Sequence, residues 1–272
     1  MLEQTAVDGP LTIERLPRRT VRFVSMAGRL PHDDWAQWYD AIYEATYGDS
    51  YRWLTDETLR AVKVTAKPND RILDVGAATG RLAIPLAEMG HRVHAIDRSP
   101  AMLHRLLVRA EALGVGHRVT AQCVSAHDID YEDAFDVGLC VFTVLLYISN
   151  RPELDATLRA ISRAIRPGGR VLLDVPRRDL FVGYHANTDS IVRNVRIAPD
   201  PTDPRGRRFS YEDEAYLKAP FFVRVSERFD ATWWPESEVL ESALDAGLEL
   251  AADVSSDFLR AASAHWWLQR VR

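Results

Sequence analysis

Residues 71–80 read RILDVGAATG, and residues 92–97 read RVHAID. Each segment contains a short apolar run of strand length, and the first run ends in a turn of small residues that leads into a helical pattern over residues 82–89. A strand that is apolar at successive positions is buried on both faces, which is typical of a parallel sheet covered by helices. This stretch therefore predicts an α/β fold.

The strand and helix alternation continues through residue 176, and a different pattern follows it. Further parallel strands are expected at residues 119–124, 135–142 and 171–175, with helices at 100–113 and 154–165 and a turn at 166–169. Antiparallel strands are expected at residues 190–197, 209–216 and 222–233, then a helix at 236–246 and a final strand pair at 248–254 and 265–271.

The N-terminal part has its own pattern. Residues 1–30 alternate weakly and suggest short strands at 11–13 and 21–23, whereas residues 32–66 show helical spacing interrupted at Gly48, with Thr55 or Asp56 as the cap of the second helix. We therefore expect four parts: an arm with N-terminal helices (1–66), a core (67–176), an antiparallel β lid inserted after strand five (177–235), and a closing helix with a strand pair (236–272).

Composition narrows the functional classes. The 272 residues include 34 basic and 39 acidic side chains, a net charge of −5, which disfavours binding that depends on many phosphate contacts. Cys123 and Cys140 both fall in expected buried strands, and two thiols cannot form a four-cysteine zinc site, so no metal is expected. Because the N-terminus lacks a signal-peptide pattern and no apolar run is long enough to span a bilayer, we expect a cytoplasmic protein with no membrane partner.

The glycine turn does not fit a phosphate-binding loop. A dinucleotide fingerprint needs glycine at positions 76, 78 and 81, where the chain has Gly76, Ala78 and Arg81, and no Gly-Lys pair exists for a nucleotide-triphosphate loop. Asp97, however, ends the second strand and can accept hydrogen bonds from both hydroxyls of a ribose. A ribose contact without a phosphate contact suggests S-adenosylmethionine (SAM).

These residues carry a family resemblance. The stretches LDVGAATGRLAIPLAEMGHRVHAIDRSPAML (73–103), FDVGLCVFTVLLYI (135–148) and IRPGGRVLLDVP (165–176) resemble the motifs of class I SAM-dependent methyltransferases. The resemblance implies a Rossmann-like sheet of seven strands, the last of them antiparallel, and SAM as the cofactor. Ala78 replaces the middle glycine of the family's usual turn.

The resemblance also implies roles for individual residues. Gly76 and Ala77 would offer backbone to the amino group of the methionyl part, Asp74 would support that turn, and Gly80 would also bind the cofactor. Asp97 would bind the ribose, and Met102 would cover the adenine. After strand three, Ser125 and Ala126 would lie near the adenine, with Asp128 as the alternative to Ser125. After strand four, Val141 would lie near the methionine moiety.

A second, less specific resemblance is to small-molecule methyltransferases of antibiotic and amino-sugar pathways. By this resemblance, Tyr39 and Tyr51 of the segment WYDAIYEATYGDSY (38–51) would bind the SAM carboxylate, and Tyr147 would take the place of a catalytic base or orienting group. The sequence contains no unambiguous base, which favours an amine or an already acidic hydroxyl as the acceptor.

The sequence therefore predicts N- or O-methylation of a small molecule in secondary metabolism, without nucleic acid as a partner, and leaves a homodimer open. Two alternatives remain. An RNA or protein methyltransferase could use the basic arm residues Arg15, Arg18, Arg19 and Arg22, and a non-catalytic SAM-binding protein would use the same core.

Overall fold

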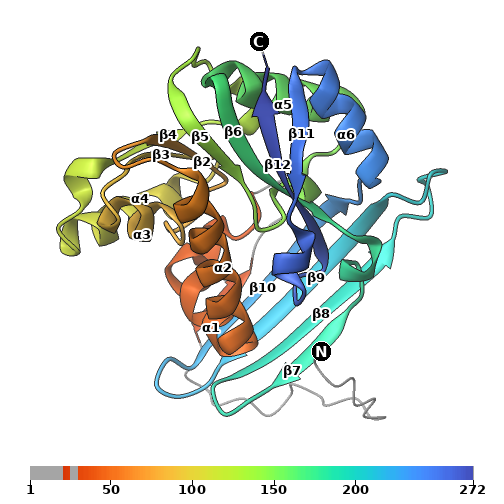
Figure 1. Ribbon diagram of the computed structural model, residues 1–272. Coiled ribbons are helices and arrows are strands. Elements are labelled where there is room, and N and C mark those ends of the chain that lie inside the picture. Colours follow the sequence, from red (N-terminus) through yellow and green to blue (C-terminus); the bar gives the residue numbers. More distant parts are fainter. Residues whose placement is uncertain (1–20, 25–29, 272) are drawn as a thin grey trace.

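The computed structural model describes residues 21–24 and 30–271 (Figure 1). Its central sheet has seven strands in the order β11-β12-β6-β5-β2-β3-β4, and β12 is antiparallel to β6 while β2, β3, β4, β5 and β6 run parallel. The predicted Rossmann-like sheet with an antiparallel last strand is confirmed. The strands are β2 (Arg71–Val75), β3 (Arg92–Asp97), β4 (Val119–Cys123), β5 (Phe135–Cys140), β6 (Ile165–Pro176), β11 (Leu248–Asp253) and β12 (Ser263–Arg270).

Helices cover both faces of this sheet because its strands are apolar on both. In β2, Ile72 packs into the cluster under one set of helices, and its neighbours Leu73 and Val75 pack into the cluster on the opposite face. The first face is covered by α2 (Asp49–Thr65), α3 (Ala83–Glu88) and α4 (Pro100–Ala112), and the second by α5 (Arg151–Ala164) and α6 (Glu236–Asp245).

A second sheet crosses below the central one (Figure 1). It has the order β1-β10-β9-β8-β7 and is antiparallel except that β1 runs parallel to β10. Its inner face packs against α1 (Tyr39–Tyr47), with Ile42 of that helix against Ile191 and Val225. The strands are β1 (Val21–Val24), β7 (Tyr184–Asn187), β8 (Ile191–Pro199), β9 (Arg208–Leu217) and β10 (Val223–Thr232).

Several local expectations were wrong. Helix α2 begins at Asp49, with Gly48 at φ 47° as its N-terminal neighbour, so Thr55 and Asp56 lie inside the helix and cap nothing. The expected turn at 166–169 belongs to β6, whose pairing with β5 shifts register there. Cys123 is exposed because β4 is an edge strand.

Other differences concern elements that were missed or lie outside the description. Strand β7 was not predicted, because its four residues are too few for a visible alternation. The strand expected at 11–13 lies outside the described residues. Within the described parts of the chain, none of the helices combines the length and the apolarity needed to cross a bilayer.

The second sheet contains a buried ion pair. Arg193 on β8 donates from Nε to Asp213 Oδ1 on β9 (3.0 Å) and from Nη2 to Oδ2 (2.6 Å), and the two side chains are only 3% and 6% exposed. Removal of one partner from such a pair leaves the other charge buried without compensation, which costs about 3–5 kcal/mol.

We therefore expect Asp213→Ala to lower the free energy of unfolding by about 3–5 kcal/mol, measured by urea denaturation, because Arg193 stays buried and charged. The double variant Arg193→Met with Asp213→Leu should recover most of this loss. Glu212→Ala on the same strand is the control, since its pairing with Arg196 (3.8 Å) is solvent-exposed and worth at most about 1 kcal/mol. An Asp213→Ala protein as stable as the control would contradict this interpretation.

Candidate functional site

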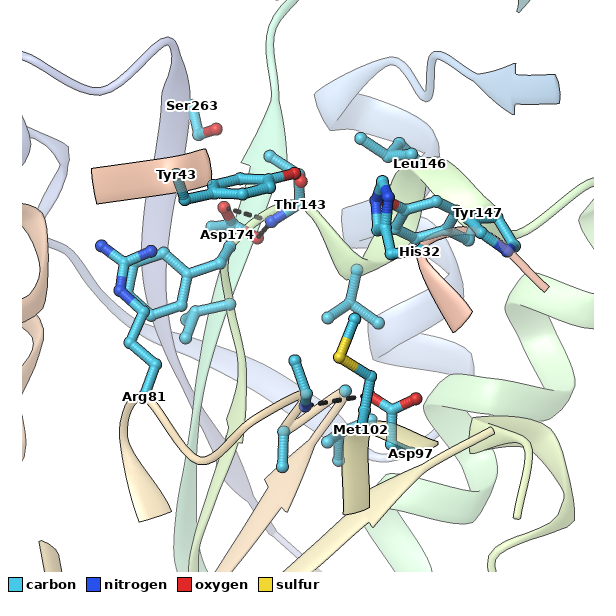
Figure 2. A pocket seen from close by; sticks show the side chains of 18 of the residues that line it. His32, Tyr43, Arg81, Asp97, Met102, Thr143, Leu146, Tyr147, Asp174 and Ser263 are labelled. Atoms are coloured by element: carbon cyan, nitrogen blue, oxygen red, sulfur yellow. Dashed lines mark hydrogen bonds between the residues drawn. The ribbon is translucent and has the colours of Figure 1, made fainter. Parts of the chain in front are cut away.

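A cavity of about 660 Å³ lies where the carboxyl ends of β2 and β3 meet α1, α2 and the inner face of the second sheet. Figure 2 shows Asp97 and Met102 on one side of it, Arg81 and Tyr43 on another, and His32 with Tyr147 opposite. In open α/β sheets, ligands bind outside the carboxyl ends of the strands, which is the position of this cavity.

The turn after β2 faces the cavity through Gly76 and Ala77. Gly76 has φ 74°, and a Cβ atom there would lie 2.5 Å from Val144 Cγ2, so the position requires glycine. The N–H groups of Gly76 and Ala77 both donate to the Ile96 carbonyl, at 2.8 and 3.0 Å. Because these two N–H groups are already bonded, the turn suits an amino group better than a phosphate.

Gly80 does not line the cavity, contrary to the expected ligand contact. It has φ 89°, and a Cβ atom there would lie 2.9 Å from Leu106 Cγ and 3.1 Å from Ile84 Cδ1. Its role is the close packing of the turn against α3 and α4.

Asp97 connects the end of β3 to the glycine turn. Its Oδ2 accepts a hydrogen bond from Ala78 N (2.9 Å) and its Oδ1 accepts one from Ser99 N (2.8 Å). Burial raises the pKa of Asp97, and the two backbone donors oppose that shift. Ser99 also caps α4 by accepting from Met102 N (3.1 Å), which places the Met102 side chain beside Asp97 (Figure 2).

The loops after β4 and β5 supply the next part of the wall. Ser125, Ala126 and Val141 all line the cavity, as the resemblance implied. Asp128, the alternative to Ser125, is not among the lining residues. The structure thus brings all the predicted site residues except Gly80 to one cavity.

Tyr39 and Tyr51 line the cavity from α1 and α2, and Arg81, which directly follows the glycine turn in the sequence, lines it too. The Arg81 guanidinium is 3.6 Å from the ring centre of Tyr51 and 3.7 Å from that of Phe142. It donates from Nε to Thr55 Oγ1 (2.7 Å) and from Nη2 to the Tyr51 carbonyl (2.6 Å). Burial raises the pKa values of Tyr39 and Tyr51, so both keep their protons and can act as donors.

Arg81 was missed as a site residue, although it directly follows the glycine turn. In the sequence pattern, Arg81 stands out only as the residue that breaks the dinucleotide fingerprint. Its fixed guanidinium beside two tyrosine hydroxyls makes this corner of the cavity suitable for a carboxylate.

Two buried acids lie on the cavity wall. Asp74 on β2 has an Oδ2 atom without a hydrogen-bond partner, and burial, with the nearby charge of Asp97, raises its pKa to about 7. Asp174 on β6 accepts from Thr143 N at 3.1 and 3.0 Å, yet burial still raises its pKa to about 7. Asp174 was missed, although an acid inside the apolar run VLLDV was a usable signal.

Tyr147 contacts His32, which in turn pairs with Glu227, and the sequence pointed to neither of these two residues. Its hydroxyl lies 2.8 Å from His32 Nε2, and His32 Nδ1 pairs with Glu227 Oε1 on β10. His32 and Tyr147 line the cavity (Figure 2). Neither His32 nor Glu227 belongs to a recognisable motif, and they meet only because the second sheet folds over the N-terminal segment.

The rest of the wall comes from the inner face of the second sheet. It consists of aromatic and aliphatic side chains together with the Arg193–Asp213 pair. Its members are Tyr184, Val195, Ile197, Tyr211 and Phe229. Beyond the part lined by Asp97 and Arg81, the cavity therefore continues as a largely apolar chamber.

Comparison with known proteins agrees with this geometry. Residues 72–169 match the family described as "Methyltransferase domain". The ubiquinone/menaquinone biosynthesis C-methyltransferase UbiE of Rhizobium leguminosarum bv. trifolii is 30% identical over 142 residues, covering 51% of this chain and 54% of that protein. The tRNA 5-carboxymethoxyuridine methyltransferase of Escherichia coli is 31% identical over 129 residues, covering 47% and 49%. The chain thus spans about half the length of the curated relatives it matches.

The fold extends further than this sequence similarity. The SAM-bound structure of CalS10, an amino pentose methyltransferase from Micromonospora echinaspora, superposes with a TM-score of 0.68 at 21% identity and covers 85% of this chain and 96% of its own. The predicted resemblance to methyltransferases is therefore confirmed for residues 72–169, which match the methyltransferase-domain family, and the likeness to CalS10 shows that the fold is shared.

Proposed function

We propose that the whole chain is a SAM-dependent methyltransferase that acts on a small molecule by N- or O-methylation, in secondary metabolism. The observation that carries the proposal is the position of Asp97, bonded to the glycine turn and beside Met102, at the mouth of an apolar chamber. We also propose a cytoplasmic location. The division of the chain into an arm with helices, a core, a lid and a closing segment is likewise part of the proposal.

The cavity residues fit SAM at each of its chemical groups. Asp97 would accept from the ribose hydroxyls, and Met102, Ser125 and Ala126 would surround the adenine. Arg81, Tyr39 and Tyr51 would bind the carboxylate. The unpartnered Asp74 Oδ2 is a buried acceptor that a cationic ligand would stabilise. When bound there, SAM supplies an electrophilic methyl group on a sulfonium.

The chain itself contributes alignment and exclusion of water. Methyl transfer to a neutral nucleophile moves the positive charge from sulfur to the acceptor, and because the charge is spread over both atoms in the transition state, the reaction is favoured in a site from which water is excluded. Alignment of two reactants can supply about 7–11 kcal/mol of the barrier reduction. Walls of tyrosine and phenylalanine rings also stabilise a cation without reacting with it.

The second sheet supports a small acceptor over a macromolecular one. It covers the cavity, whose volume of about 660 Å³ lies within the range of about 300–1,000 Å³ of small-molecule sites. The CalS10 fold is consistent with this proposal, whereas the tRNA methyltransferase similarity keeps RNA as the alternative substrate to be tested. A non-catalytic SAM-binding protein would need neither the chamber nor Tyr147.

The direct test is incubation with SAM labelled in its methyl group and metabolite extracts of the producing strain. We expect label in one or a few small molecules, each of which carries one methyl group in place of a hydrogen. Label only in RNA or protein fractions would contradict the small-molecule proposal. SAM bound without any transfer would favour the non-catalytic alternative.

Asp97→Asn should weaken SAM binding at least tenfold, measured by calorimetry, because charge-assisted hydrogen bonds contribute about 1.5–3 kcal/mol each. The amide keeps the shape of the carboxylate but can accept from only one of Ala78 N and Ser99 N, so a thermal melt must establish that the variant is folded. Asp130→Asn is the matched control, since its side chain is 96% exposed. Unchanged SAM affinity in the folded Asp97→Asn protein would exclude the ribose contact.

SAM binding should release protons near pH 7 and should tighten as pH rises from 6 to 8. In the free protein, the pKa values of Asp74 and Asp174 are raised to about 7. Their contribution to the free energy of unfolding is therefore present below pH ~4, the pKa of an aspartate in the unfolded chain, and is lost as pH rises through 7. A bound cation favours their ionised forms and reverses that loss. Calorimetry at pH 7 in buffers of different ionisation enthalpy measures how many protons are released for each SAM bound. Asp74→Asn should reduce that number. Zero protons released by the wild type would contradict the assignment.

A further inference from the structure

Three side chains from distant parts of the chain lie in series beside the chamber, the first two joined by a hydrogen bond and the last two by an ion pair. Tyr147 ends the 3-10 helix η5 (Val144–Tyr147), His32 immediately precedes η2 (Asp33–Trp38), and Glu227 lies on β10. Tyr147 Oη is 2.8 Å from His32 Nε2, His32 Nδ1 pairs with Glu227 Oε1, and His32 N donates to Glu227 Oε2 (2.8 Å). His32 (7% exposed) and Glu227 (5% exposed) are both buried, so the surrounding protein fixes their positions.

The chemistry of the three groups sets the direction of proton transfer. Burial alone would raise the pKa of Glu227, but His32, whose ring pairs with this carboxyl and whose backbone N–H donates to it, lowers that pKa overall, so Glu227 is a carboxylate. A carboxylate beside Nδ1 places the ring proton on that nitrogen and leaves Nε2 as an acceptor. Tyr147 therefore donates to His32, and its own oxygen can accept a proton from the cavity.

Tyr147 is suited to pass a proton on and not to act as a base alone. Burial raises the pKa of its hydroxyl well above the ordinary value, and the neighbouring Tyr43 and Glu227 add to that shift. A free tyrosinate is therefore inaccessible at neutral pH. When Tyr147 passes its own proton to His32 as it accepts the proton of the acceptor, no tyrosinate has to form.

The chamber offers no unpaired charge from the second sheet. Among the described residues of that sheet that line the cavity, the charged ones are Arg193 and Asp213, and they are bonded to each other. An ammonium acceptor would lose its hydration without gaining a partner there. An uncharged acceptor with an apolar or ring-shaped body fits these walls better.

We propose that Tyr147, His32 and Glu227 form a proton relay for an uncharged acceptor that is methylated on a hydroxyl group. This inference rests on the proposed function and specifies its substrate class as alcohols or phenols. The sequence shows no unambiguous base and favours an amine or an already acidic hydroxyl, whereas the relay through His32 allows an ordinary hydroxyl.

With the relay, every bond, electron pair and proton of the methyl transfer is accounted for. The acceptor oxygen forms a bond to the methyl carbon with its own electron pair, and the carbon–sulfur bond breaks with its pair staying on sulfur, which loses its positive charge. The hydroxyl proton passes to Tyr147 Oη while the Tyr147 proton passes to His32 Nε2. The resulting imidazolium is paired with Glu227 and returns its proton to water after product release.

Tyr147 would touch the acceptor and is the catalytic residue of this set, as predicted from the sequence. His32 and Glu227 act through it and are positioning residues. The titratable and charged groups that surround His32 and Tyr147 come from α1, β3, the loop after β3, β9 and β10, and all must be considered in a pH profile. They are Tyr39, Tyr43, Asp97, Arg98, Tyr211 and Glu227.

The test for the substrate class uses the labelled small-molecule product made from methyl-labelled SAM and metabolite extract. Hydriodic acid cleaves O-methyl groups as volatile methyl iodide under conditions that leave N- and C-methyl groups in place. We expect the label in the volatile fraction. Label that stays involatile would overturn the hydroxyl assignment while leaving the methyltransferase proposal intact, whereas no transfer to any molecule would overturn both.

The relay is tested with His32→Asn, Glu227→Gln and Tyr147→Phe on the same product. General base catalysis contributes about 10²–10⁴-fold, so kcat should fall at least 100-fold in His32→Asn and in Tyr147→Phe, with the SAM dissociation constant within threefold of wild type. Asparagine suits the left-handed backbone of His32 (φ 66°). Glu212→Gln, the same change on the outer face of the adjacent strand β9, should leave kcat unchanged.

The pH profile separates a relay from a structural role. Because the relay needs His32 Nε2 as a proton acceptor, the pH dependence of kcat should differ between the wild type and His32→Asn. A His32→Asn enzyme with near wild-type kcat, or one with the wild-type pH dependence, would overturn the relay.

Discussion

The hydrogen bonds between the Asp97 carboxylate and two backbone N–H groups are the constraint on which the rest of the site depends. They connect the end of β3 to the turn after β2 through Ala78 and to the start of α4 through Ser99. Ala78 adopts φ 45°, a conformation that costs an L-residue about 1–2 kcal/mol, and the bond from its N–H offsets that strain. One carboxylate thus fixes the turn and the α4 cap and lines the cavity that both of them border.

The chamber depends on a second constraint, which is the parallel pairing of β1 with β10. The pairing ends at Val24 and Ser226, the residue before Glu227, and the described chain resumes at Leu30, two residues before His32. Strand β1 thus lies beside the strand that carries Glu227, and His32 lies between that strand and Tyr147. The central sheet supplies the cofactor side of the cavity, and the N-terminal segment with the second sheet completes the acceptor side.

The central sheet was predictable because its signals are local. Apolar runs such as 71–75 and 135–140 specify buried strands, and Asp97 could be identified from its place at the end of one. The acceptor side was not predictable in the same way. His32 and Glu227 are 195 residues apart, and their meeting depends on pairing in the second sheet, which neither composition nor periodicity encodes. Gly80 was misjudged because a glycine demanded by packing reads the same in sequence as one demanded by a ligand.

The central claim is that this cavity binds SAM through Asp97. A crystal structure of the protein grown with S-adenosylhomocysteine tests it most directly. The account predicts electron density for the adenosine beside Met102, with both ribose hydroxyls within hydrogen-bond distance of the Asp97 carboxylate. A ribose turned away from Asp97, or a nucleoside found outside this cavity, would contradict it.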